Sequence, residues 1–354
     1  MRSPGSMSIV CRRRSGELVV RERPMLEKPK GPRTWPFLRG VATVVESLKL
    51  GSQALRWSAE LYEQDLLAED EKEAKARGPV RPSGPGLMSA LALSVAALAT
   101  QGPDPLGPLP EGGGKKSSLL IALPILFAVA IFIVLPQLAA EGVTKLFHLE
   151  LAITSPAFQA ITGAAKLAIV VGYLLLIRRM AEVRRVFQYH GAEHKTISTY
   201  EATEELVVEN ARRKTTLHPR CGTTFLVMVA LVSIVVFTGI GALLPELPGG
   251  RAAKFVSFLF MKLPFLPVIA AVTFEIQRLF ARYCTTGPLR ALLWPGFLVQ
   301  KITTAEPDDA QLEVALASLR ATLWREEALT APAPADRTFA GYGELIADPG
   351  YARA

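Results

Sequence analysis

The chain has 354 residues, a formal net charge of +8 and four histidines. Half of its residues are hydrophobic and its mean hydropathy is +0.27, which argues against an ordinary soluble domain and favours a membrane protein. The positive charge does not require a nucleic-acid partner, because basic flanks of membrane helices give the same excess and the sequence contains no RNA- or DNA-binding motif.

The cysteines indicate a reducing compartment. Cys11, Cys221 and Cys284 are odd in number and far apart in the chain, a spacing that argues against a disulfide framework. The first residues lack the long apolar run of a cleaved signal peptide. We therefore expect an internal apolar segment to direct membrane insertion.

Residues 1–78 are predicted to form a small N-terminal cytoplasmic region. Alternation of Val and Leu with Arg and Glu predicts two short strands around a Ser-Gly turn in residues 8–22. A helical period in residues 41–62 predicts a helix. This helix either packs on the cytoplasmic region or lies in the membrane surface with Trp57 at the interface, and we prefer the second alternative.

A Pro/Gly-rich linker, residues 79–117, follows this region. Its apolar piece, residues 87–100, is too short to cross a bilayer comfortably. We expect this piece to be peripheral or re-entrant, because an additional crossing would put the arginine-rich N-terminal region outside the cell.

The remaining apolar residues predict an α-helical polytopic membrane domain over residues 118–280. Basic residues are concentrated in its loop 178–222 and after its last apolar segment. The positive-inside rule then places this loop and both terminal regions in the cytoplasm, which requires an even number of crossings. We expect four transmembrane helices, each near the length that a bilayer core requires, at residues 119–138, 160–177, 223–244 and 255–280.

The C-terminal region, residues 281–354, is predicted to be cytoplasmic. A helix start at Pro307, Asp308 and Asp309, followed by apolar residues on one broad face, predicts an amphipathic helix. We expect this helix to dock onto the other cytoplasmic parts. These regions are also where a protein partner would bind, whereas the membrane domain has lipid as its partner.

One short pattern carries the chemistry of this sequence. His190 and His194 are one helical turn apart, and Glu193 lies between them. On a helix the two imidazoles share a face and can bind one metal ion. The order His-x-x-Glu-His occurs in inverted zinc proteases, where the glutamate is the general base. The pattern predicts a divalent metal, zinc first, with Glu193 as the catalytic residue.

Two histidines leave a catalytic zinc short of protein ligands, since such sites take three. His218 and Cys221 precede the third apolar segment, and antiparallel spans would bring them to the surface where the histidine pair follows the second segment. We predict either His218 or Cys221 as the third protein ligand of a catalytic site, and both as ligands of a closed structural site. The alternative is that the pair lies on an ordinary surface helix and that His218 belongs to a turn. Acidic residues after the pair are other candidates: Glu201, Glu204 and Glu205.

Ionisable residues also occur inside the apolar segments, where an unpaired charge is costly. We predict that Lys166 and Glu275 pair within the helix bundle. For Glu275 the alternative is a helical pair with Arg278. Lys262 is expected to extend towards the membrane surface.

Four stretches resemble one known family: RGVATVVESLKLGSQAL, VFQYHGAEHKTI, LHPRCGTTFL and TTAEPDDAQLEVA. In this order, and over nearly the whole chain, they are similar to the YqhQ-like family of bacterial membrane proteins, the domain of unknown function 1385. The resemblance implies a polytopic protein of the bacterial inner membrane, of a kind described as metal-dependent enzymes. The family pattern usually has a Gly-rich segment before the piece that matches residues 1–4, and residues 101–114 are an insertion relative to it.

Three functional hypotheses follow. In the first the protein is a metal-dependent hydrolase, in which Glu193 takes a proton from the attacking water. In the second all four predicted ligands bind a structural metal, and the protein is a non-catalytic membrane scaffold. In the third, a transporter is built around Lys166 and Glu275.

Overall fold

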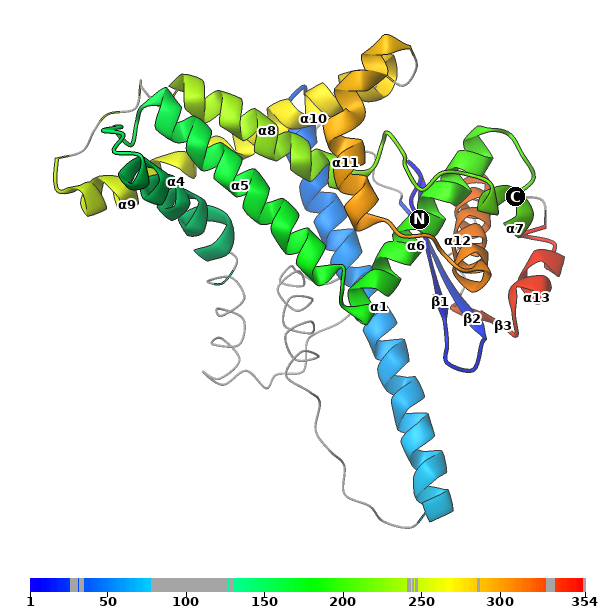
Figure 1. Ribbon diagram of the computed structural model, residues 1–354. Coiled ribbons are helices and arrows are strands. Elements are labelled where there is room, and N and C mark those ends of the chain that lie inside the picture. Colours follow the sequence, from blue (N-terminus) through cyan, green and yellow to red (C-terminus); the bar gives the residue numbers. More distant parts are fainter. Residues whose placement is uncertain are drawn as a thin grey trace.

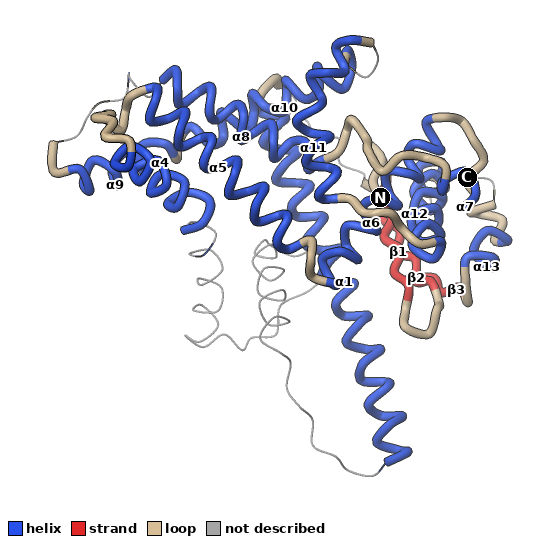
Figure 2. The backbone as a smooth tube through the Cα atoms, in the orientation of Figure 1, coloured by secondary structure: helices blue, strands red, loops and turns tan. Residues whose placement is uncertain are grey.

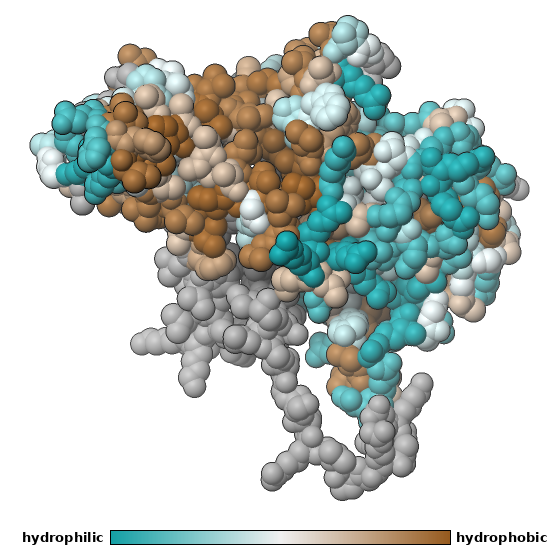
Figure 3. All heavy atoms as spheres, viewed as in Figure 1, coloured by the Kyte–Doolittle hydropathy of each residue, from teal (hydrophilic) through white to brown (hydrophobic). Residues whose placement is uncertain are grey.

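The fold has two parts that lie side by side (Figure 1). The computed structural model describes residues 1–25, 31, 35–77, 127, 130–240, 243, 245, 248–284, 287–328 and 335–352. An apolar part, made of helices, comprises the described residues of 130–177 and 222–303. A polar part comprises the described residues of 1–24, 181–220 and 309–352, and it contains the three strands of the sheet (Figure 2). Hydrophobic residues dominate the visible face of the first part and hydrophilic residues that of the second (Figure 3).

Two long helices, α5 (Pro156–Ile177) and α8 (Gly222–Ile240), form the centre of the apolar part. Helix α5 begins at Ser155, whose side chain accepts a hydrogen bond from the backbone three residues on. Its 22 residues extend about 33 Å, which is enough to cross a hydrocarbon core. The two helices approach closely at Gly163, where an added Cβ would lie 2.3 Å from Ile234 Cγ1.

Other helices surround this pair. One pair is bent by 45°, and the bend has a local cause, because Pro264 and Pro267 lack the amide hydrogens that a continuous helix requires. These helices are η2 (Ala130–Val134, a π-helix), α4 (Leu135–Leu146), the bent pair α9 (Arg251–Lys262) and α10 (Phe265–Tyr283), η4 (Pro288–Leu293, a 3-10 helix) and α11 (Trp294–Thr303).

Within the described residues, the structure shows two or three helices of membrane length, where the sequence predicts four spans. Within the described residues, α5 and α8 are long and apolar enough to cross a membrane, and the bent pair α9–α10 makes a third if it forms one span. Half of the first expected span, residues 119–138, lies outside the described residues, and its later part is η2 and the start of α4. The short apolar piece 87–100 lies wholly outside them.

The polar part contains a three-stranded antiparallel sheet in the order β1-β2-β3. Strands β1 (Ser6–Arg12) and β2 (Leu18–Pro24) lie in the stretch where residue alternation predicts strands, and their turn includes Gly16 at φ 96°. Strand β3 (Arg337–Phe339) comes from the other end of the chain and pairs with β2. The two terminal regions therefore share one sheet.

Helix α12 (Asp309–Glu327) is the central helix of the polar part, where the sequence predicts an amphipathic helix. A capping box between Asp308 and Gln311 starts it. One side packs against the sheet and α13 (Tyr342–Ala347), and the other packs against α6 (Ala181–Glu201) and α7 (Val208–Arg212). On the side that faces the sheet, two of the buried residues are alanines, Ala317 and Ala321, so the pattern of large apolar residues does not reveal burial on two faces.

Helix α1 (Leu38–Arg77) connects the two parts. Near its start Gly40 lies against Phe274 of α10. Farther along, Trp57 is only 4% exposed, and the Arg21 guanidinium of β2 lies 4.4 Å from the centroid of its ring. The expectation that Trp57 lies at a membrane interface is therefore wrong, because its indole packs against the sheet.

The predicted pair of Lys166 and Glu275 is not formed. The Glu275 carboxylate instead binds the Arg39 guanidinium of α1 through two bonds of 2.7 and 2.5 Å. Lys262 does not extend to the surface, since its Nζ donates a hydrogen bond to Gln159 Oε1 at 2.9 Å inside the apolar part. The ion pair on which the transporter hypothesis rested is thus replaced by a contact between α1 and α10.

Candidate metal centre

Helix α6 carries the histidine pair. It follows α5 after a short turn at residues 178–180, so its first residues start at the end of the apolar part. The four-residue spacing puts His190 and His194 on one face, and their ring centroids are 4.4 Å apart. His194 is buried and His190 is half-buried.

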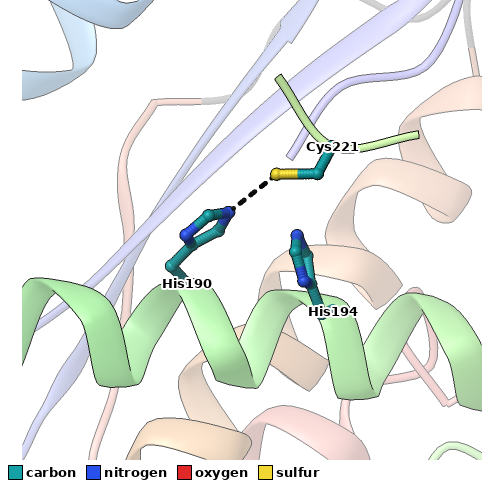
Figure 4. A group of neighbouring side chains, drawn as sticks. All are labelled: His190, His194 and Cys221. Atoms are coloured by element: carbon teal, nitrogen blue, oxygen red, sulfur yellow. Dashed lines mark hydrogen bonds between the residues drawn. The ribbon is translucent and has the colours of Figure 1, made fainter. Parts of the chain in front are cut away.

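Cys221 meets the histidine pair from the other end of the loop, directly before α8 (Figure 4). Its Sγ lies 3.1 Å from His190 Nε2. One ligand atom from each of His190, His194 and Cys221 lies within 4.8 Å of the other two. Ligands of a tetrahedral zinc are about 3.3–3.6 Å apart, given bonds of about 2.0–2.3 Å. Small side-chain adjustments would therefore let the three atoms share one ion.

Backbone carbonyls orient both imidazoles from behind. His190 Nδ1 lies 2.9 Å from the Thr303 carbonyl oxygen, and His194 Nδ1 lies 2.5 Å from the Thr216 carbonyl oxygen. A carbonyl can only accept, so each Nδ1 carries the proton and, in the neutral ring, each Nε2 keeps its lone pair. This arrangement, in which the second nitrogen of a ligand histidine is held by a carbonyl, is usual around protein-bound metals.

The electrostatics of the centre favour an ionised thiol. Burial raises the pKa of the Cys221 thiol, but hydrogen bonds from His190 and His194 outweigh burial and lower it to about 5. Burial lowers the pKa of His190, and its contacts with Cys221 outweigh burial and raise it. Cys221 is therefore a thiolate at neutral pH, the form in which cysteine binds metals.

His218 lies beside this group without joining it. Its ring centroid is 5.7 Å from that of His194. Its Nδ1 accepts a hydrogen bond from the Arg220 amide at 3.4 Å, and its Nε2 lies 3.2 Å from a carboxylate oxygen of Glu201. Burial lowers the pKa of His218 more than Glu201 raises it. A neutral His218 that donates from Nε2 to Glu201 satisfies both contacts and keeps both nitrogens away from a shared ion.

Glu193 is exposed on α6 and is outside the group of three ligand atoms. It acts electrostatically on His190 and on the amino group of Met1, so it lies close to both. Glu201 is a second acidic residue beside the centre, and its carboxylate binds His218 and Arg220. Of the remaining acidic candidates, Glu204 binds Lys214 in a separate ion pair.

Sequence reasoning missed the glycine that lets the backbone close around the centre. The segment after α11 runs along α6, and the Ala305 amide donates to the Phe187 carbonyl at 2.9 Å. A Cβ on Gly191 would stand 2.2 Å from the Ala305 carbonyl oxygen. The signal was present in the sequence, since a glycine inside a helix between two histidines is unfavourable without a packing reason.

Two glutamines and a lysine that the sequence did not single out also fix the centre. Gln300 accepts from the His218 amide at 2.8 Å and donates to the His218 carbonyl at 2.7 Å. Gln277 donates to the Cys221 carbonyl at 3.1 Å. Lys195, buried on α6, donates to the Arg212 carbonyl at 2.9 Å. These contacts position the loop but contribute no ligand atom.

Comparison with known proteins places the centre inside a matched region. A family model described as "Protein of unknown function (DUF1385)" matches residues 35–325. The chain is 30% identical over 300 residues to "Uncharacterized protein YqhQ" of Bacillus subtilis (strain 168), a match that covers 83% of this chain and 79% of that protein. No solved structure matches the chain. The range matched by the family model includes the histidine pair and Cys221.

Proposed function

This chain belongs to the DUF1385 family of proteins of unknown function, and we propose that it is a metal-dependent enzyme integrated in the bacterial inner membrane. The metal, zinc first, is held by His190, His194 and Cys221. Hydrolysis is the reaction class that fits best. The observation that carries the proposal is the convergence of three ligand atoms within 4.8 Å behind which two backbone carbonyls fix the imidazoles.

Three protein ligands favour a catalytic site over a closed structural one. Catalytic zinc sites keep one position for water or substrate, whereas structural sites use four protein ligands. Within the described residues, the nearest fourth candidate is His218, and both of its nitrogens already have partners. The donor set therefore resembles an open site of mixed nitrogen and sulfur ligands.

A divalent metal bound here would supply Lewis acidity to a substrate and to water. The protein's own residues would orient the metal ligands, supply negative charge and accept a proton. The carbonyls of Thr303 and Thr216 keep both Nε2 atoms directed at one point, and the Cys221 thiolate contributes negative charge. Glu193, exposed beside His190, is the group we propose as general base.

The membrane assignment rests on length, composition and charge. Helices α5 and α8 are long and apolar enough to cross a bilayer. The basic loop between them belongs to the polar part over residues 181–220, together with residues 1–24 and the described residues of 309–352. The positive-inside rule then orients the polar part to the cytoplasm. The metal centre lies where the two parts meet, so its substrate would reach it from the cytoplasmic leaflet or from the cytoplasm.

The second candidate is a non-catalytic scaffold with a structural metal. The observation in its favour is that the His218 ring is buried and only 5.7 Å from the His194 ring. A rotation away from Glu201 would make His218 a fourth ligand. In that case His218→Ala should reduce metal affinity as much as His194→Ala does, whereas the enzyme proposal expects a much smaller effect.

Metal content tests the proposal directly. The full chain is purified in detergent without chelator, and metal is measured by elemental analysis. We expect stoichiometric metal in the wild type and its loss in the His190→Ala, His194→Ala double variant and in Cys221→Ser. His148→Ala is the matched control, since His148 lies outside the metal centre at the end of α4, and it should keep its metal. Absence of stoichiometric metal from the wild type would reject the proposal.

The role of Glu193 separates the two candidates. As general base, Glu193→Gln should keep the metal and abolish complementation of a deletion strain. In a scaffold the same exposed substitution should be nearly silent in both measurements. Glu204→Gln, which changes another exposed acid of the same loop, is the matched control and should complement under either candidate.

A further inference from the structure

Two lysines of the apolar part, Lys166 and Lys262, are half-buried among its helices. Lys166 is the eleventh of the 22 residues of α5, so it lies about 16 Å from either end of that helix. Lys262 is the last residue of α9, at the bend before α10. Each is partly covered by neighbouring helices, and the two ammonium groups are close enough to repel one another.

The surroundings of Lys262 hold its ammonium group in place. Its Nζ donates to Gln159 Oε1 at 2.9 Å. The same atom lies 4.7 Å from the centroid of the Phe258 ring and 5.0 Å from that of Phe237. Ring faces and a neutral amide favour a cation but do not neutralise it. The amide nitrogen of Gln159 is itself bound to the Ile153 carbonyl, so the side chain is fixed at both ends.

No carboxylate compensates these charges within the described residues. The described helices of the apolar part contain two carboxylates, and each binds an arginine: Glu141 binds Arg251, and Glu275 binds Arg39. Lys166 has no ion-pair partner in the part of the chain that the structure describes. Two positive charges in a region of low dielectric constant are strongly unfavourable without a counter-charge.

Two further features of the neighbouring helices suit an anion. The N-terminal end of α10 follows Lys262 after two residues, and a helix N-terminus attracts negative charge. On α4, which packs against α5, the side chain of Gln137 is 1% exposed, and both its amide nitrogen and its amide oxygen lack a hydrogen-bond partner. A buried amide without partners is costly, and its nitrogen can donate to an anion.

We propose that Lys166 and Lys262 bind a small oxyanion, a phosphate or carboxylate group, at the bend between α9 and α10. The anion supplies the counter-charge that the described helices lack. Its two possible sources are a free anion and the headgroup of an anionic phospholipid. This site is independent of the metal centre, so the metal content of the lysine variants should equal that of the wild type.

The test measures the thermal unfolding midpoint of the full chain in detergent as inorganic phosphate is raised, at constant ionic strength maintained with chloride. For the wild type we expect a saturable rise of roughly 2–4 °C. In Lys166→Met and in Lys262→Met the phosphate response should disappear, and the phosphate-free midpoint should be equal to or above that of the wild type. The conservative variant Lys166→Arg should retain the response, because it keeps the charge.

Lys145→Met is the matched control, since this lysine on α4 has a side chain that is 75% exposed, and its phosphate response should equal that of the wild type. Phospholipid that co-purifies is measured in parallel by mass spectrometry. Retention of anionic lipid by the wild type and its loss from the Lys166→Met, Lys262→Met double variant would identify a headgroup as the source. A wild type that shows neither a phosphate response nor lysine-dependent lipid would overturn the proposal, as would a response that persists in the double variant.

Discussion

The carbonyl oxygen of Ala305 occupies the space into which a side chain at Gly191 would project, with 2.2 Å between that oxygen and an ideal Cβ. Glycine at this position allows the segment after α11 to run along α6. The same segment delivers the Thr303 carbonyl to His190 Nδ1. A single absent side chain thus determines how the imidazole is oriented.

Gly191→Ala should therefore damage both the fold and the centre. The added methyl group must displace the Ala305 backbone, which we expect to cost about 1–3 kcal/mol in the free energy of unfolding. If the centre binds a metal as we propose, the displaced carbonyl should also weaken that binding by about 10–100-fold, the usual effect of losing a partner behind a ligand histidine. Denaturant titration and a competitive metal-binding assay measure the two effects. Gly51→Ala in α1, where a Cβ meets no atom within 4 Å, should instead stabilise the protein by about 0.5–1 kcal/mol.

The pH dependence of the alkylation rate should show whether Cys221 is ionised. In metal-free protein the rate should rise with pH and reach half its maximum near pH 5, because the pKa of Cys221 is lowered to about 5 and the thiolate is the reactive form. Cys11 provides an internal control, since burial raises the pKa of its thiol and its rate should rise only in alkaline solution. Mass spectrometry of the separated peptides measures both cysteines in one sample. A Cys221 profile that coincides with that of Cys11 would contradict the assignment.

His190 should control that profile. Its hydrogen bond is the leading contact that lowers the pKa of Cys221, so His190→Ala should move the midpoint of the Cys221 alkylation profile to higher pH. The profile of Cys11 should not move in the same variant. An unchanged Cys221 midpoint would show that the imidazole does not stabilise the thiolate.

The position of Trp57 can be tested by truncation. Trp57→Ala removes a large side chain that is 4% exposed and packs against Arg21, and we expect a loss of about 3–5 kcal/mol in the stability of the polar part. Trp35, which is 61% exposed, is the matched control, and Trp35→Ala should change stability by less than about 0.5 kcal/mol. Urea denaturation followed by near-ultraviolet circular dichroism compares the two. Equal losses of stability in Trp57→Ala and Trp35→Ala would contradict the burial of Trp57 and favour a lipid-facing position.

The partner of Glu275 can be identified by double-mutant cycles. Arg39→Ala and Glu275→Gln should be non-additive in the thermal unfolding midpoint, because each removes the same bidentate pair. Lys166→Met and Glu275→Gln should be additive, since the structure forms no contact between these residues. Additivity for Arg39 with Glu275, and non-additivity for Lys166 with Glu275, would instead support the pair of Lys166 and Glu275 that the sequence predicts.

The arrangement of His190 and His194 follows from helical periodicity alone, and the approach of Cys221 follows from two antiparallel apolar segments. The sequence could not distinguish Cys221 from His218, because the difference depends on one partly buried contact between His218 and Glu201. Glu201 lies on the same helix as the histidine pair, but nothing in its spacing reveals that it binds His218 and keeps that imidazole out of the group formed by His190, His194 and Cys221. Ligand geometry is decided here by side-chain partners rather than by the order of residues.

The polar part was less predictable. Strand β3 is three residues long and gains its stability from β2, more than 300 positions earlier in the chain. A strand that short has no alternating pattern of its own to detect. The sequence predicts helix α12 but not its burial on a second face, because the alanines of that face look neutral in sequence. Both features depend on contacts between the two ends of the chain.

The separation of His190 from Cys221 along the chain has a thermodynamic consequence. An ion bound to both would close a loop of 31 residues, and restricting the unfolded chain in this way is worth about 3.7 kcal/mol of conformational entropy by the model used for cross-links. That closed loop contains α7 and the stretch that leads into α8. Removal of the bound ion with a chelator should consequently make residues 190–221 more susceptible to proteolysis, even in a catalytically inactive variant.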